Sequence, residues 1–287
     1  MSASSNQLFS SHPRSFQSNH YVYPVLSRRA GGISIGVNLN VDKFCNFHCI
    51  YCQVDRDVPK DVEFVELKRL YEELDWTVDL VASGRIFEGK QFSATPQSMR
   101  RLNDIAFSGD GEPTVYRNFA DTISVAAEVR RRHGLEDLKL VLITNASQFH
   151  RDHVQRGLEI LDQNNGEIWA KLDAGSEEYY RLVARTSVKW QQILDNIREA
   201  ARKRPIVIQS LFMRINEQPP SADEIAAYCS RLQEIVAAGG QIKLVQIYTV
   251  ARPPAETCVS ALSDNELTAI ADTVKRQTTL PVAAFPG

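Results

Sequence analysis

Residues 33–52 of this 287-residue chain, ISIGVNLNVDKFCNFHCIYC, join a strand-like segment directly to a loop that holds three cysteines. In residues 33–40, branched residues alternate with small or polar ones, which is the period-two pattern of a strand. We expect the branched face to pack beneath a helix and the other face, with Asn38 and Asn40, to line a cavity and contact substrate. The fold and the function are therefore expected to centre on this segment.

The three cysteines favour an iron–sulfur cluster over other uses of clustered thiols. Cys45, Cys49 and Cys52 follow a C-x₃-C-x₂-C spacing. Disulfides are the poorer hypothesis because no secretory signal is recognisable. Zinc prefers four ligands in paired C-x₂-C knuckles, and His48 lies too close to its neighbouring cysteines for an easy tetrahedron. Soft thiolates suit iron–sulfur chemistry, and three of them would leave one iron of a [4Fe–4S] cluster open.

With Tyr51 as the aromatic residue, C-x₃-C-x-aromatic-C resembles the signature of the radical S-adenosylmethionine (radical SAM) enzymes. A second segment, FSGDGEPT (107–114), resembles the glycine-rich Gly-Gly-Glu motif of that family. The resemblance implies that the open iron binds the amino and carboxylate groups of SAM and that Tyr51 lies near its adenine. It also implies that the SAM ammonium is bound by backbone carbonyls and Glu112 of the motif, which comprises Gly109, Asp110, Gly111 and Glu112. Asp110 departs from the commonest form.

Composition describes an ordinary globular protein without a strongly basic face. Hydrophobic residues make up 43% and charged residues 24% of the chain, and the net charge is −2. No apolar run approaches the length of a membrane-spanning helix, so we expect a cytoplasmic protein with no membrane partner. Local pairs of arginines, Arg28-Arg29 and Arg100-Arg101, would favour a nucleic-acid substrate if they gathered at one surface.

From residue 33 onward, strand and helix patterns alternate. We predict strands at 33–40, 105–109, 139–146, 167–175, 205–213 and 241–250 and helices near 66–82, 117–133, 149–163, 187–203, 221–238 and 263–277, with Ser187 capping the fourth helix. Shorter elements are expected at 21–27 (extended), 96–103 (helix) and 280–285 (strand). Alternation of this kind predicts a parallel sheet with outer helices, and six units fit a partial (β/α)₆ TIM-like barrel, the fold that the resemblance also implies. Residues 1–20 are expected to be a flexible tail, and 21–287 a single radical SAM core domain with an extended first crossover at about 53–104.

Polar residues at the carboxyl ends of the predicted strands are the remaining site candidates, since function gathers at those ends in parallel barrels. Lys171 is the candidate catalytic residue, and its neighbour Asp173 could either pair with it or touch SAM. The other candidates for SAM contacts are Thr144, Asn145, Gln209, Gln246 and Tyr248, and those for substrate contacts are Met213, Arg214 and Arg252. Cys229 is expected to be a buried apolar residue of a helix, whereas Cys258 could approach the mouth of the barrel.

Four fragments together resemble a bacterial radical SAM group that is related by similarity to tRNA wyosine synthase. They are GVNLNVDKFCNFHCIYCQVDR (36–56), FSGDGEPT (107–114), KLDAG (171–175) and VQIYTVAR (245–252). The resemblance implies reductive cleavage of SAM to methionine and a 5′-deoxyadenosyl radical, with an electron from a reductant such as flavodoxin or ferredoxin. The leading hypothesis is hydrogen abstraction from a small molecule or natural-product intermediate, because a second cysteine cluster and a basic face are not evident. Modification of a tRNA nucleoside is the second hypothesis. A non-catalytic iron–sulfur or zinc protein is the third, and it leaves FSGDGEPT unexplained.

Overall fold

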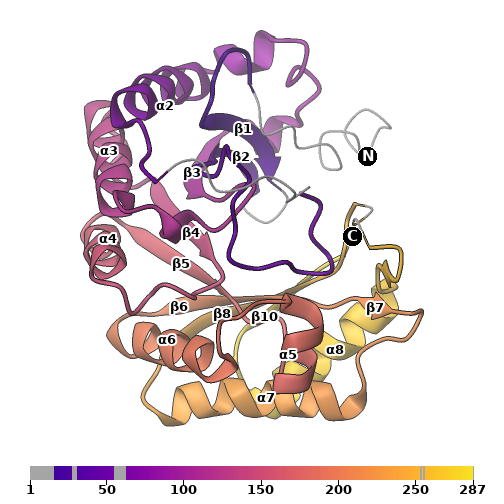
Figure 1. Cartoon of the computed structure of the whole chain (residues 1–287). Coiled ribbons are helices and arrows are strands. Elements are labelled where there is room, and N and C mark those ends of the chain that lie inside the picture. The colour runs from indigo at the N-terminus through magenta and orange to yellow at the C-terminus, as the bar shows by residue number, and fades with distance from the viewer. Residues whose placement is uncertain (1–15, 28–30, 55–62, 253, 255, 287) are drawn as a thin grey trace. The chain divides into compact units, whose positions relative to one another are not determined.

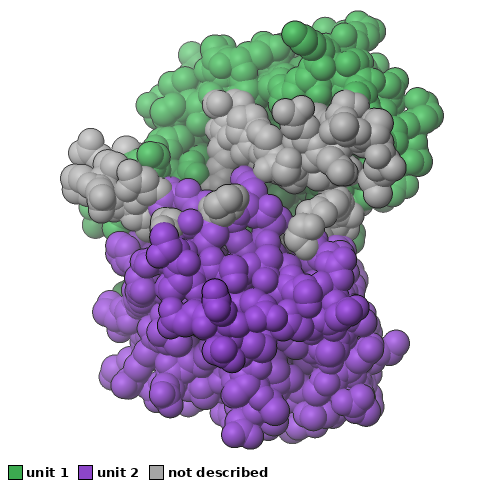
Figure 2. Space-filling view, turned by 90° about the vertical axis from the view of Figure 1, so that its right-hand side faces the viewer, with its two compact units in different colours: residues 1–44, 59–143, 151–167 green, residues 45–58, 144–150, 168–287 purple. Residues whose placement is uncertain are grey.

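The computed structural model of the chain describes residues 16–27, 31–54, 63–252, 254 and 256–286 (Figure 1). The chain divides into two compact units, coloured separately in Figure 2. Unit 1 comprises residues 1–44, 59–143 and 151–167, and unit 2 comprises residues 45–58, 144–150 and 168–287.

Four strands form the sheet of unit 1. Strand β1 (Val22–Ser27) runs antiparallel to β2 (Gly32–Val37). Strand β2 pairs in parallel with β3 (Leu102–Phe107), and β3 pairs in parallel with β4 (Lys139–Thr144). Every residue of β2 is buried, as expected for a parallel strand covered on both faces. The extended segment predicted at 21–27 is therefore an edge strand.

Three helices accompany these strands: α2 (Leu67–Ala82), α3 (Phe119–Arg132) and α4 (Asp152–Asp162). Their buried residues recur every three or four positions, which gives each helix one apolar face toward the sheet. Helices α3 and α4 approach closely because Gly157 of α4 has no side chain. A Cβ atom there would lie 2.5 Å from the ring of Phe119. Short 3₁₀ turns lie at η1 (Arg85–Glu88), η2 (Gln97–Met99) and η3 (Pro113–Val115).

The strands of unit 2 continue the parallel pattern. Strand β5 (Gly166–Lys171) pairs with β6 (Ile206–Leu211), β6 with β8 (Ile242–Tyr248), and β8 with β10 (Val282–Phe285). A small antiparallel pair, β7 (Arg214–Ile215) and β9 (Val259–Ser260), stands apart from them. The helices are α5 (Glu177–Ala184), α6 (Trp190–Lys203), α7 (Ala222–Ala237) and α8 (Asp264–Thr278).

The strand order in the described part of the chain is β1-β2-β3-β4-β5-β6-β8-β10. The predicted alternation of strands and helices from residue 33 onward is confirmed, and the fold class is a partial (β/α)₆ TIM-like barrel. Strand β10 pairs in parallel with β8, which confirms the short final strand predicted at 280–285.

Two local predictions were wrong. Residues 96–103 do not form a helix, because η2 ends at Met99 and strand β3 already begins at Leu102. Ser187 does not cap the helix before residue 203, since that helix begins at Trp190 after Lys189. A separate helix, α5, precedes it and is capped by Ser176, whose side chain accepts a hydrogen bond from Tyr179 N.

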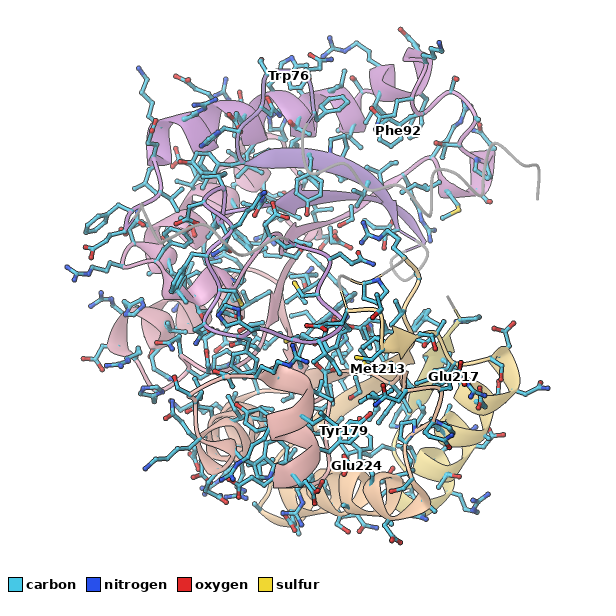
Figure 3. The ribbon with its side chains drawn as sticks, turned by 45° about the vertical axis from the view of Figure 1, so that its right-hand side comes forward. Trp76, Phe92, Tyr179, Met213, Glu217 and Glu224 are labelled. Atoms are coloured by element: carbon cyan, nitrogen blue, oxygen red, sulfur yellow. The ribbon has the colours of Figure 1, made fainter. Side chains whose placement is uncertain are left out.

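The described end of the predicted tail, residues 16–20, contacts α2. The backbone N–H of His20 donates to Glu73 Oε1 at 2.8 Å, and the ring of Phe16 lies 5.9 Å from that of Trp76. Both Trp76 and Phe92, which Phe16 also contacts, are labelled in Figure 3. None of the helices in the described residues is long and apolar enough to cross a membrane.

Candidate functional site

The three cysteines lie in unit 2 on a loop that hydrogen bonds hold against the end of α5. Cys45, Cys49 and Cys52 are all free thiols. The anchoring bonds run from His48 N to Ala184 O (3.0 Å), from Ile50 N to Val183 O (3.0 Å) and from Thr186 Oγ1 to Asn46 O (2.7 Å). The cysteine loop is therefore shaped by protein contacts of its own.

The turn after β4 gives the cysteine loop a second anchor. Asn145 Nδ2 donates to Asn46 Oδ1 at 2.9 Å, and Asn46 Nδ2 donates to Ser147 Oγ at 2.7 Å. Thr144 Oγ1 accepts from Ala146 N at 3.0 Å, which stabilises the positive φ of 60° at Ala146. Thr144 and Asn145, predicted to contact SAM, thus shape the turn that positions the cysteine loop.

The chemistry of the thiols fits metal-bound rather than free thiolates. Burial, with smaller contributions from the nearby Asp173 and Cys45, raises the pKa of the Cys49 thiol to about 12. A metal cation reverses that balance and deprotonates a coordinating thiol. No three Cys, His, Asp or Glu side chains of the described residues converge on a single ion. A cluster does not require such convergence, because each cysteine binds a different iron atom.

A partly buried cation, Lys171, lies next to the cysteine loop. We call Lys171, Asp173, Tyr51 and Tyr248 the Lys171 centre. Lys171 Nζ donates to Tyr248 Oη at 2.6 Å and lies 3.3 Å from Asp173 Oδ2. The Tyr51 hydroxyl donates to the same carboxylate at 2.5 Å, so Asp173 joins the cysteine loop to the end of β5. Lys171 Nζ also lies 5.2 Å from the Tyr51 ring centre and 5.1 Å from that of Tyr248, within cation–π range.

The Lys171 centre keeps its lysine protonated. Burial lowers the pKa of Lys171, but Asp173 and Tyr248 together raise it by more, so the net shift is above its ordinary value. Burial raises the pKa of Tyr51 well above its ordinary value, and the adjacent Asp173 adds to this. Asp173 was expected either to pair with Lys171 or to touch SAM, and the structure shows the ion pair with Lys171.

Replacing Lys171 with methionine is expected to lower the free energy of unfolding by about 2 kcal/mol, because the partly buried Asp173 carboxylate then loses its cation. The double variant Lys171→Met/Asp173→Asn should recover most of that loss, since the neutral amide can still accept from Leu211 N, now 2.8 Å from Asp173 Oδ1. Chemical denaturation followed by circular dichroism measures both. Equal losses in the two variants would contradict a structural ion pair.

Two buried glutamines satisfy each other on adjacent strands. Gln209 Nε2 donates to Gln246 Oε1 at 3.1 Å, and Tyr248 Oη donates to Gln209 Oε1 at 3.4 Å. Their burial among apolar strand residues predicted polar partners, and each provides one for the other. The chain Gln246–Gln209–Tyr248–Lys171 thus extends the Lys171 centre across β8, β6 and β5.

The three predicted substrate residues of unit 2 have other roles in the structure. Met213, labelled in Figure 3, is fully buried and packs in an apolar cluster with Ile50 and Val250. Arg214 Nη2 donates to Glu266 Oε1 at 2.6 Å, at the start of α8. The carbonyl of Arg252 accepts from Gln53 Nε2 at 2.9 Å, just beyond the cysteine loop. Met213 thus packs in the core and Arg214 binds a carboxylate of the same chain, and a substrate contact by either residue stays a prediction.

Sequence reasoning missed Glu224 and Tyr179, both labelled in Figure 3. The buried Glu224 carboxylate accepts from Gly175 N at 2.5 Å and from Ser176 Oγ at 2.5 Å, which fixes the loop after Asp173 to α7. The sequence Ser-Ala-Asp-Glu (221–224) suggests a capping box, but only its Ser221 half is used locally. Tyr179 Oη is buried and has no hydrogen-bond partner among the described residues.

Of the two other cysteines, Cys229 is confirmed as a buried residue of α7. Cys258 is partly buried and packs against the same apolar cluster as Met213. Cys258 therefore packs against the same apolar cluster as Tyr51 and Tyr248, but it is not part of the cysteine loop.

Unit 1 holds the glycine-rich loop Gly109–Glu112, which follows β3. Asn38 Nδ2 donates to Asp110 Oδ2 at 2.7 Å, and Asn40 Nδ2 donates to Glu112 O at 3.1 Å. The amides of Asn38 and Asn40 are thus directed at this loop, and their contact with substrate stays a prediction. Glu112 is buried and its Oε1 accepts from Thr114 N at 3.2 Å and from Thr114 Oγ1 at 2.5 Å. The carboxylate predicted to bind SAM also caps the start of η3.

The comparison with protein families decides the classification. A model described as the radical SAM superfamily matches residues 39–222, which include both the cysteine loop and the glycine-rich loop. The chain belongs to the radical SAM superfamily.

Solved structures of radical SAM proteins share this fold at low sequence identity. A radical SAM methyltransferase from Sphaerobacter thermophilus aligns with a TM-score of 0.61 and 11% identity, over 93% of this chain and 70% of the other. Archaeal TYW1 aligns with a TM-score of 0.57 and 12% identity, over 97% of this chain and 90% of the other. At such identities the likeness concerns the radical SAM fold alone.

Curated relatives are similar over part of their length. A protein named GTPase Obg from Brachyspira hyodysenteriae is 23% identical over 249 residues, covering 85% of this chain and 32% of that protein. A UPF0026 protein from Methanocaldococcus jannaschii is 27% identical over 162 residues, covering 56% of this chain and 43% of that protein. This radical SAM chain therefore spans less than half the length of these relatives.

Members of the radical SAM superfamily generally use a [4Fe–4S] cluster and SAM, and the residues of this chain fit both groups. The cysteine loop offers three free thiols on an anchored backbone. The loop Gly109–Glu112 has glycines where a side chain would collide with the asparagines beside it. Glycines of this kind leave backbone carbonyls open to close approach by a ligand.

Proposed function

We propose that this chain is a radical SAM enzyme that acts on a small molecule or a natural-product intermediate. Cys45, Cys49 and Cys52 would hold a [4Fe–4S] cluster, and the loop Gly109–Glu112 would bind the ammonium of SAM. When bound, the two groups supply a 5′-deoxyadenosyl radical, formed with methionine by one-electron cleavage of SAM, that abstracts hydrogen from an unactivated carbon. The observation that carries this proposal is a loop of three free thiols that the protein itself anchors.

The residues around the cysteine loop supply position and dryness. Asn145 and Ser147 hold the loop through Asn46, and Asp173 holds it through the Tyr51 hydroxyl. Apolar residues next to Tyr51, including Ile50 and Leu211, exclude water from its surroundings. Exclusion of water protects a reactive intermediate and strengthens the electrostatic interactions within a site.

Charge pairing favours a substrate without many phosphates. Near the carboxyl ends of the unit 2 strands, Lys171 pairs with Asp173 at 3.3 Å, Arg214 with Glu266 at 2.6 Å, and Arg185 with Glu256 at 2.5 Å. Each of these cations already has a carboxylate partner in the same chain. A protein that binds nucleic acid needs cations that can replace the counterions of its phosphates.

Modification of a tRNA nucleoside remains the second proposal, supported by the fold shared with archaeal TYW1. Of the four arginines that would favour it, the structure describes two, Arg100 and Arg101. Arg100 Nη2 donates to Ser93 O at 2.8 Å, and Arg101 Nε donates to Gly31 O at 3.2 Å, so both guanidinium groups contact backbone carbonyls. Arg28 and Arg29 lie outside the described residues. The proposed partners are a one-electron reductant, such as a flavodoxin or ferredoxin, and the proposed location is the cytoplasm.

Anaerobic turnover tests the proposal. The chain is reconstituted with iron and sulfide, then incubated with dithionite and SAM, and 5′-deoxyadenosine is measured by mass spectrometry. We expect 5′-deoxyadenosine at least tenfold above a reaction without dithionite. Addition of total tRNA should not change the amount of 5′-deoxyadenosine. In a filter-binding assay at physiological salt, the protein should retain no labelled tRNA. Deuterium transfer from labelled extracts into 5′-deoxyadenosine would then identify the substrate.

The outcomes separate the three candidate functions. Stimulation by tRNA, with deuterium transferred from a labelled nucleoside, would replace the small-molecule proposal with the tRNA one. A fully reconstituted protein whose electron paramagnetic resonance spectrum does not change with SAM would instead be a non-catalytic iron–sulfur protein. Zinc retention with no iron incorporation would exclude both enzymatic proposals.

A further inference from the structure

Two asparagines beyond β2 interlock with the glycine-rich loop beyond β3. Strands β2 and β3 are parallel neighbours, with Val37 paired to Phe107, so the chain leaves both strands side by side. The bond from Ser108 N to Val37 O, 3.1 Å, continues that pairing past the strand ends. Asn38 and Asn40 are spaced by two residues, and both are buried.

Asn38 makes hydrogen bonds with both of its amide atoms. Its Oδ1 accepts from Asp110 N at 3.0 Å and from Asn40 N at 3.2 Å, and its Nδ2 donates to Asp110 Oδ2 at 2.7 Å. The amide therefore contacts the backbone and the side chain of Asp110 together. Asp110, which stands where the Gly-Gly-Glu motif has its first glycine, thus has a defined partner in Asn38.

Asn40 bridges the glycine-rich loop to Phe44, the last residue of its own segment of unit 1. Its Nδ2 donates to Glu112 O at 3.1 Å and to Phe44 O at 2.9 Å. Because both partners are carbonyl oxygens, the orientation of the amide group is fixed, with its nitrogen toward them. One side chain thus sets the positions of two carbonyl groups, one on each segment.

The two glycines of the loop make room for the same amides. A Cβ atom on Gly109 would lie 2.1 Å from Asn38 Oδ1, and one on Gly111 would lie 2.7 Å from Asn40 Cγ and 1.9 Å from Phe44 O. Alternate residues of one segment therefore meet alternate residues of the other. The asparagine side chains occupy the space that side chains at positions 109 and 111 would otherwise take.

We propose that Asn38 and Asn40 are positioning residues for SAM, with Asp110 as the specific partner of Asn38. They hold the loop Gly109–Glu112 in the conformation that directs its backbone carbonyls at the ammonium of SAM. This inference rests on the proposed function for its ligand. It assigns to Asp110 a role in shaping the loop rather than in contacting the ligand.

An exchange of the two side chains tests the pairing. Asn38→Asp places two carboxylates 2.7 Å apart in a partly buried loop, whereas Asn38→Asp/Asp110→Asn restores a donor and an acceptor in reversed order. We expect Asn38→Asp to raise the Kd for SAM about tenfold or more, a loss of at least 1.4 kcal/mol. The exchanged double variant should bind within about threefold of Asp110→Asn, which serves as the matched control because Asn38 can still donate to its amide oxygen.

A second ligand distinguishes positioning from general damage. 5′-Methylthioadenosine has the adenosine part of SAM but neither its ammonium nor its carboxylate, so its Kd should stay within about twofold in all variants. Isothermal titration of the reconstituted protein with both ligands gives these values. Unchanged SAM affinity in Asn38→Asp, no rescue in the double variant, or equal losses for both ligands would each overturn the inference.

Thermal unfolding separates this inference from the proposed function. If the wild-type chain binds no SAM, the proposed function fails, and the pairing is then measured by stability. In that case Asn38→Asp should lower the Tm and the double variant should restore it. If Asn38→Asp does not fold, the double variant must still fold and bind SAM as Asp110→Asn does, and its failure to do so would overturn the inference.

Discussion

Replacing Cys49 with alanine is expected to remove the iron–sulfur cluster and all formation of 5′-deoxyadenosine. A [4Fe–4S] cluster held by three thiolates loses a third of its protein ligands in this variant, and it already lacks the usual fourth cysteine. We expect iron to fall from about four atoms per chain to a small fraction of one after anaerobic reconstitution. The amount of 5′-deoxyadenosine should fall about a hundredfold or more, which corresponds to at least about 2.7 kcal/mol of lost transition-state stabilisation.

Cys229→Ala is the matched control for this prediction. Cys229 is 1% exposed in α7, where it behaves as a small apolar side chain, so its replacement removes a thiol without touching the cysteine loop. Iron and 5′-deoxyadenosine should match the wild type in that variant. Iron is measured by colorimetric assay and the cluster by its absorbance. A Cys49→Ala chain that retained a full cluster, or a Cys229→Ala chain that lost it, would contradict the assignment of the ligands.

Replacing Gly111 with alanine is expected to destabilise unit 1 and to abolish SAM binding. A Cβ atom at this position would lie 1.9 Å from the carbonyl oxygen of Phe44, which is backbone and cannot rotate away. Overpacking of this kind costs about 3 kcal/mol when the backbone must shift. In a chain of this size that loss corresponds to a fall in Tm of roughly 5–10 °C. The shifted loop would also misplace the carbonyls proposed to bind the SAM ammonium.

Gly89→Ala provides the comparison, because its added Cβ atom would meet nothing closer than Ile86 O at 3.3 Å. Its φ of −72° is accessible to alanine without strain. Differential scanning fluorimetry and titration with SAM compare the two variants. A Gly111→Ala chain as stable as Gly89→Ala, with wild-type affinity for SAM, would show that the tight contact with Phe44 relaxes at little cost.

Local patterns predicted most of the fold because they depend on short-range physics. The period-two run of residues 33–40 predicted β2, and the helix predicted at 263–277 is α8. The short elements were harder. The capped helix α5 was missed because its eight residues give little periodic signal. Leu102 was assigned to a helix, although its pairing with Ile33 places it in β3.

The cysteines of the site were predictable because their chemistry follows from spacing along the chain. Partners distant in sequence were not predictable in the same way. The carboxylate of Glu224 belongs to a segment that suggests a capping box, yet it binds Gly175 and Ser176, about fifty residues earlier. Arg214 was considered only as a substrate contact, and its ion pair with Glu266, more than fifty residues later, was not predicted. In both cases a partner close in space competed with a role inferred from the local sequence.

The sequence by itself determined the spacing of the three cysteines, the glycine-rich loop and the alternation of strands and helices, since each depends on residues close together along the chain. The tertiary structure decided what the polar residues at the strand ends contact. Asn38 and Asn40 bind the glycine-rich loop, Asn145 anchors the cysteine loop, and Lys171 pairs with Asp173. The physical reason is that a buried polar group must find a partner within about 3 Å, and the packing of the whole chain determines which groups come that close.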